Sequence, residues 1–181
     1  MFRRGFKFAL LVLLTYLLQS TVAAYIAVGG VAPNIALAVC AVVSVGLGRK
    51  YTFVLSLTVG YLLEIMVPAL NYLNLILYPV CAMLGALAFS DKSERKLEEE
   101  RTLGKHGGNL PAHLRTVFGA LVSISIFEAV NLLYIYLNGI QLGATHYGRA
   151  LISVCYTAAL AGVLQFPIRW WFGVYKLKKA R

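Results

Sequence analysis

The chain has 181 residues, of which 60% are hydrophobic and 13% charged, and its formal net charge is +10 at pH 7. A typical globular domain is closer to half apolar and a quarter charged, so this composition argues against an ordinary soluble domain. The positive charges cluster at the ends of apolar runs rather than on one amphipathic face, which argues against a nucleic-acid partner.

Six long runs with almost no charge predict an all-α integral membrane protein, because a helix needs about 20 apolar residues to cross the bilayer. We expect one six-helix membrane domain over residues 1–181, with a cytoplasmic loop at 90–111. The first run is longer than the apolar core of a signal peptide, so we expect a retained helix. Pro33 suits the first turn of the second helix. The expected spans are 8–28, 32–48, 51–67, 72–89, 114–137 and 149–172.

The lysines and arginines predict the orientation of these spans. With six spans and both termini inside, all of the 17 basic residues except Arg149 fall on one side. This asymmetry follows the positive-inside rule and predicts that both termini are cytoplasmic. Trp170 and Trp171 fall where an inner aromatic belt is expected.

Small residues recur at every fourth position of the second expected span. Such stripes let helix backbones approach closely in lipid. Two interpretations stay open: packing inside the protein's own bundle, or a face for another membrane protein. The residues are Ala32, Ala36, Cys40, Ser44 and Gly48.

Two glutamates, Glu64 and Glu128, interrupt the third and fifth spans. Ionisable groups at membrane depth are costly and are usually functional or paired. Counted from the basic end of each span, both carboxylates lie at roughly 20 Å, that is, at one depth in the outer half. Arg149 is the only basic residue on the outer side, at the expected start of the sixth span, so we expect it to pair with at least one of them. A structural hydrogen bond or a direct role in binding are both open.

Other polar residues within the spans predict hydrogen bonds between helices. Gln19, Ser20 and Thr21 interrupt the first span and are expected to face the bundle. Asn131 lies one turn beyond Glu128 on the same face. The sequence lacks a Ser–His or Cys–His arrangement, an HExxH motif and a phosphate loop, so we expect no enzyme activity, metal or cofactor.

The first half of the chain resembles the rod shape-determining protein MreD family. That family has a Gln-Ser-Thr near the end of its first helix and a Pro-Asn or Pro-Asp opening the second. It also has a Gly-x-x-x-Asp/Glu ending the third, and an Asn before a fourth helix with a late Gly. The matching residues over roughly 10–90 are Gln19, Ser20, Thr21, Pro33, Asn34, Gly60, Glu64, Asn74 and Gly85. The family's Gly-Ser-rich turn after the acidic residue is missing here.

The resemblance implies a non-catalytic scaffold of the cell-elongation machinery in the bacterial cytoplasmic membrane. Its expected partners are the lipid bilayer, an MreC-like periplasmic scaffold and, further, an MreB-like cytoskeletal protein and peptidoglycan synthases. The implied fold is that of the substrate-binding subunits of energy-coupling-factor transporters. Gln19, Asn34 and Glu64 would then shape or stabilise the face used by MreC.

A second function fits the same size and span count: a vitamin-binding subunit of an energy-coupling-factor importer, or a related small-molecule transporter. Such a subunit needs a polar, aromatic-lined pocket at its outer end. The residues that could line one are Glu64, Glu128, Asn131, Tyr134 and Arg149.

Overall fold

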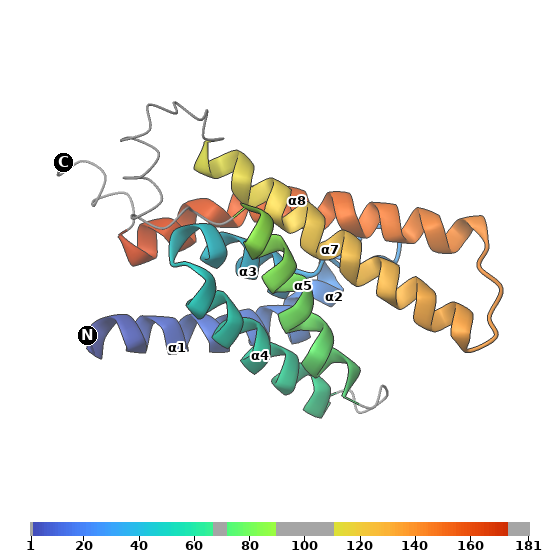
Figure 1. The fold of residues 1–181 in the computed structure, drawn as a ribbon, viewed down its shortest axis with the longest axis horizontal. Helices are drawn as coiled ribbons and strands as arrows, with labels where there is room; N and C mark the ends of the chain where they lie inside the picture. Colours follow the sequence, from blue (N-terminus) through green and yellow to red (C-terminus); the bar gives the residue numbers. More distant parts are fainter. Residues whose placement is uncertain (1, 67–71, 90–110, 174–181) are drawn as a thin grey trace.

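The computed structural model describes residues 2–66, 72–89 and 111–173, and this part of the chain is helical with no strand. The predicted loop at 90–111 therefore lies outside the described residues, apart from Pro111. Figure 1 shows the helices in chain order. They are α1 (Phe2–Leu17), the π-helix η1 (Leu18–Val22), α2 (Ala23–Tyr25), α3 (Ile35–Gly46), α4 (Arg49–Met66), α5 (Leu73–Phe89), α7 (Ala112–Leu137) and α8 (Ala144–Phe172).

Each of the six predicted spans contains a helix, so the all-α prediction is confirmed. Three stretches are long and apolar enough to cross a membrane: Gly5–Tyr25, Ala112–Leu137 and Ala144–Phe172. The helices α3 and α5 are apolar but shorter, and α4 has 18 residues that include Arg49, Lys50 and Glu64. The structure thus identifies three candidate spans, and the count of six stays a prediction.

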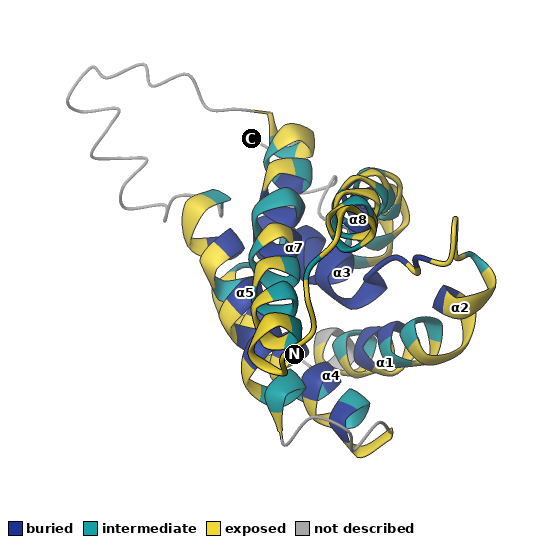
Figure 2. Cartoon of the chain, turned by 90° about the vertical axis from the view of Figure 1, so that its right-hand side faces the viewer, coloured by how far each residue is buried: buried dark blue, intermediate teal, exposed yellow. Residues whose placement is uncertain are grey.

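The shortest of the main helices, α3, forms the centre of the bundle. Every residue from Ile35 to Val45 is buried, and α3 packs against α1, α4, α5, α7 and α8 (Figure 2). Ala38 and Ala41 meet Ala120 of α7 and Ala161 of α8 in a cluster made only of alanines. Side chains this small let three helix backbones approach closely, as small residues do between membrane helices.

The predicted small-residue stripe is therefore part of the protein's own packing. Ala36, Cys40 and Ser44 are buried inside the bundle, which confirms the first of the two interpretations for these three residues. Ala32 is exposed, and Gly48 follows the helix with a φ of 96°. The buried part of the stripe therefore lies within α3, and the first and last residues of the stripe lie outside that helix.

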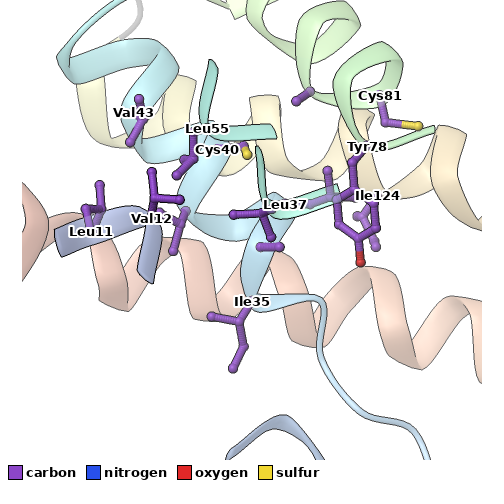
Figure 3. Packing of buried hydrophobic residues seen from close by; sticks show 14 of the residues in the cluster. Leu11, Val12, Ile35, Leu37, Cys40, Val43, Leu55, Tyr78, Cys81 and Ile124 are labelled. Carbon is purple, nitrogen blue, oxygen red and sulfur yellow. The ribbon is translucent and has the colours of Figure 1, made fainter. Parts of the chain in front are cut away.

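The main apolar core joins α3 to α1, α4, α5 and α7. Figure 3 shows Leu37, Cys40 and Val43 of α3 among side chains of the neighbouring helices. Tyr78 of α5 packs its ring edge-on against Phe127 of α7, with centroids 5.2 Å apart.

Two glycines mark the closest helix crossings. A Cβ atom on Gly60 would lie 2.9 Å from the carbonyl oxygen of Asn74, so α4 and α5 could not pack this tightly with a larger residue. A Cβ atom on Gly85 would lie 2.7 Å from the carbonyl oxygen of Gly119, between α5 and α7. Both glycines belong to the residues that carry the family resemblance.

The helices α7 and α8 form a long antiparallel hairpin that extends beyond the rest of the bundle (Figure 1). The helix α8 contains the predicted last span, 149–172, and begins earlier, at Ala144. Gly143 caps this start, and its N–H donates to Nδ1 of His146 at 3.2 Å. Arg149 consequently lies in the second turn of α8 instead of at its start.

Candidate functional site

The polar residues of the first span divide into one that binds another helix and two that do not. Gln19 lies in the π-helix η1, and its Oε1 accepts the N–H of Ala36 in the first turn of α3 at 3.1 Å. Ser20 and Thr21 are exposed, and both donate to the carbonyl of Leu17 in their own segment. The expected contact between helices is confirmed for Gln19 and wrong for the other two residues.

Asn34 joins three helices at the start of α3. Its Oδ1 accepts the N–H of Leu37 at 3.0 Å, which makes it the N-cap, and its Nδ2 donates to the Tyr78 hydroxyl at 3.2 Å. Its backbone N–H donates to Oγ1 of Thr157 in α8 at 3.0 Å. Pro33 precedes this cap, so the expected place of Pro33 in the first helical turn is wrong; asparagine is among the preferred N-cap residues.

Glu64 binds the start of the next helix. Its two carboxylate oxygens accept the backbone N–H groups of Tyr72 and Asn74, each at 3.0 Å, and the side chain is buried. The first N–H groups of a helix have no partner within it, and its N-terminus favours negative charge. Glu64 therefore joins the end of α4 to the beginning of α5.

The second glutamate lies in a polar cavity of about 290 Å³ between α7, α8 and the turn that precedes α3. Oε1 of Glu128 accepts the hydroxyl of Ser153 at 2.6 Å. Nη2 of Arg149 donates to the carbonyl of Gly30 at 3.2 Å. The lining residues with polar side chains are Glu128, Asn131, His146, Arg149 and Ser153.

The predicted hydrogen-bonded pair between Arg149 and a glutamate does not form among the described residues. Gly30 has a φ of 75°, and its carbonyl accepts a hydrogen bond from the guanidinium of Arg149. The hydroxyl of Ser153 donates to one carboxylate oxygen of Glu128. Glu128, Asn131 and Arg149 do line one cavity, but Glu64 and Tyr134 do not. A carboxylate and a guanidinium on one cavity could bind the two charges of a small zwitterion.

Sequence reasoning missed a second buried polar group, at the opposite ends of α7 and α8. Arg169 is only 4% exposed. Its Nη2 donates to Oγ1 of Thr116 at 2.8 Å and to the carbonyl of Ala112 at 3.0 Å. His113 Nδ1 lies 3.1 Å from Oε1 of Gln165. One signal was available, because Gln165 and Arg169 are four residues apart and share a helix face.

The described residues contain no group of three His, Cys, Asp or Glu side chains that could hold a metal ion. The chain matches no protein-family model, no curated protein and no solved structure. Over the described residues the fold is all-helical, with three helices long and apolar enough to cross a membrane.

Proposed function

We propose that this protein is a non-catalytic membrane scaffold of the MreD type, which joins an MreC-like periplasmic protein to the peptidoglycan synthases and the cytoskeleton. The proposal places all six helical segments in the bacterial cytoplasmic membrane, with both termini in the cytoplasm. It rests on the sequence resemblance and on the part that the resembling residues play in the fold.

One observation carries the proposal: four residues of the resemblance, Gln19, Asn34, Gly60 and Glu64, lie at contacts that join neighbouring helices. Gln19 and Asn34 both bind the first turn of α3, and Asn34 also binds Tyr78 of α5. Glu64 binds the start of α5, and Gly60 allows α4 to lie against that helix. These residues stabilise the relative positions of helices instead of forming a reactive centre, as a scaffold requires.

The contacts of these four residues also leave an apolar surface on α4 that a partner helix could contact. Tyr61 and Ile65 are 54% and 59% exposed on the helix that Glu64 joins to α5. Exposed apolar side chains at membrane depth face either lipid or another protein. On this proposal, the four residues act by holding the α4 surface in place.

The test is photo-crosslinking in native membranes with the full chain. A photoreactive residue replaces Tyr61 on α4 in one variant and the similarly exposed Leu151 on α8 in the other. A cross-link from position 61 to a single-span protein with a periplasmic coiled coil supports the scaffold. Recovery of paired ATPases with their membrane coupling subunit would overturn it.

The polar cavity favours a second candidate, the binding subunit of a small-molecule transporter. Glu128 and Arg149 line the same cavity without a hydrogen bond between them. Its volume is near the lower end of the roughly 300–1,000 Å³ of ligand pockets. Native mass spectrometry of the purified chain against water-soluble vitamins and amino acids tests this candidate. Binding that Glu128→Gln abolishes and Glu64→Gln retains supports it, and the absence of any bound compound contradicts it.

A further inference from the structure

An apolar groove of about 170 Å³, separate from the polar cavity, lies between α1 and α8, with α3 as its floor. Its walls are leucines of α1 and residues of the last turns of α8, and Val39 lies at the bottom. Thr15 of the lining donates to the carbonyl of Leu11 in its own helix at 2.7 Å. Apart from Thr15 and the indole N–H of Trp171, the side chains that line the groove have no hydrogen-bonding group.

Hydrogen bonds join α8 to α1 at one end of this groove and to the residue that follows α2 beyond the other end. At the basic end, Nζ of Lys7 donates to the carbonyl of Trp171 at 2.9 Å and lies 5.8 Å from the centre of its ring. At the other end, the Tyr156 hydroxyl donates to the carbonyl of Ile26 at 2.7 Å. Figure 1 shows α1 beginning and α8 ending on the same side of the molecule.

The dimensions of the groove match one acyl chain. Its lining runs from Leu10 in α1 to Leu18 at the start of η1, about 12 Å at 1.5 Å per residue. One leaflet of the hydrocarbon core is about 15 Å thick, half of the full core. An apolar cavity of about 150 Å³ takes up a benzene molecule, so this volume holds several methylene groups. A helix, about 10 Å across, needs several times more room over that length.

The positive charge of Lys7 at the mouth of the groove favours a lipid with an anionic headgroup. The ammonium group of Lys7 has three donors, and the Trp171 carbonyl uses one of them. Trp171 lines the groove and is 46% exposed, as expected for a tryptophan at the level of lipid headgroups. We propose that this groove binds one acyl chain of an anionic phospholipid, whose phosphate group is held by Lys7.

The two tryptophans of the chain provide a direct measurement of this occupancy. Trp171 lines the groove, whereas Trp170 is 79% exposed and does not. The full chain is placed in phosphatidylethanolamine nanodiscs with a minor fraction of phosphatidylglycerol brominated on its acyl chains. We expect Trp171, measured alone in Trp170→Phe, to be quenched at a several-fold lower fraction of brominated lipid than Trp170, measured alone in Trp171→Phe.

Equal quenching of the two tryptophans would overturn the proposal. Quenching of Trp171 by brominated phosphatidylethanolamine as strong as that by brominated phosphatidylglycerol would also overturn it, because the site would then lack headgroup selection. Lys7→Gln should remove the preference for phosphatidylglycerol, whereas Lys50→Gln, which removes a charge at the start of α4, should keep it.

A matched pair of substitutions on α1 locates the acyl chain. Leu13 and Leu14 are 52% and 50% exposed, but only Leu14 lines the groove. By native mass spectrometry, Leu14→Phe should lower retained phosphatidylglycerol several-fold, and Leu13→Phe should leave it unchanged. An equal loss in both variants would assign the lipid to the general lipid shell and contradict the proposal. Thermal unfolding of each variant confirms that the bundle is intact.

Discussion

The helices α3 and α8 are both apolar, yet they occupy opposite kinds of environment. In α3, 12 residues long, the run from Ile35 to Val45 is completely buried, whereas α8 has 29 residues and exposes Leu151, Val163 and Trp170. The difference lies in side-chain size, because α3 is built largely of alanine and valine. Small side chains allow five helices to surround α3, whereas many of the larger apolar side chains of α8 remain exposed at the surface of the bundle.

The largest expected effect comes from a bulky residue in the alanine cluster. Ala38→Leu should lower the free energy of unfolding by about 1–3 kcal/mol, because added volume forces α7 and α8 away from α3. The control is Ala159→Leu on the exposed face of α8, which should change stability by less than about 0.5 kcal/mol. Unfolding by detergent titration measures both. Equal losses would show that α3 is no more tightly packed than α8.

The second largest effect on stability is expected at Asn34, the N-cap of α3. Asn34→Ala removes the N-cap and the bond to Tyr78, and we expect a loss of about 1–2 kcal/mol. Asn138→Ala is the matched control, because Nδ2 of Asn138 bonds only the exposed carbonyl of Tyr134 at the end of α7. The same titration should detect almost no change in this control. A comparable loss of stability in both variants would contradict the conclusion that Asn34 stabilises α3 through its capping bond and its bond to Tyr78.

The two glutamates should respond differently to loss of charge. Glu64→Gln leaves one oxygen to accept two backbone N–H groups, and it removes a negative charge at a helix N-terminus, so we expect a loss of about 1 kcal/mol. Glu128→Gln retains an oxygen acceptor for Ser153 and should change stability by only a few tenths of a kcal/mol. Thermal unfolding distinguishes the two. A larger loss for Glu128→Gln would reverse these roles.

The smallest effects are expected in the π-helix. Gln19→Ala should cost about 0.6 kcal/mol, the average for a hydrogen bond between membrane helices. Ser20→Ala and Thr21→Ala should be close to neutral, since a hydroxyl that bonds back to its own helix adds little stability. Unfolding measurements on all three variants check this order. A loss in Ser20→Ala as large as in Gln19→Ala would be inconsistent with an exposed serine.

The helical segments were predictable because long uncharged runs identify them, but their ends were less so. Asn34 is a strong capping residue, and its effect placed the start of α3 after Pro33 rather than at it. The start of α8 at Ala144 depends on Gly143 and His146, whose polar pattern resembles a loop. Hydropathy finds the apolar centre of a helix better than its polar ends.

The members of the polar cavity were partly predictable, but their hydrogen bonds were not. The sequence places Glu128 and Arg149 on neighbouring segments, and both line the cavity. It does not reveal that the carbonyl of Gly30 accepts a hydrogen bond from Arg149, because every residue has a backbone carbonyl and side-chain patterns do not show which one is available. For the same reason, the sequence identifies Arg169 only as a basic residue near the end of a helix, whereas in the structure its buried side chain donates to the carbonyl of Ala112 in α7.

The hydrogen bond from the Asn34 amide to Thr157 has a consequence for how the protein is made. The two residues are 123 positions apart, so the ribosome synthesises the donor long before its acceptor. A 12-residue helix is about 18 Å long, shorter than the roughly 30 Å of hydrocarbon in a bilayer. On the proposed membrane placement, we expect the packing of α3 to be completed only after α8 has been synthesised. Truncation before α8 should expose this segment to quality-control proteases.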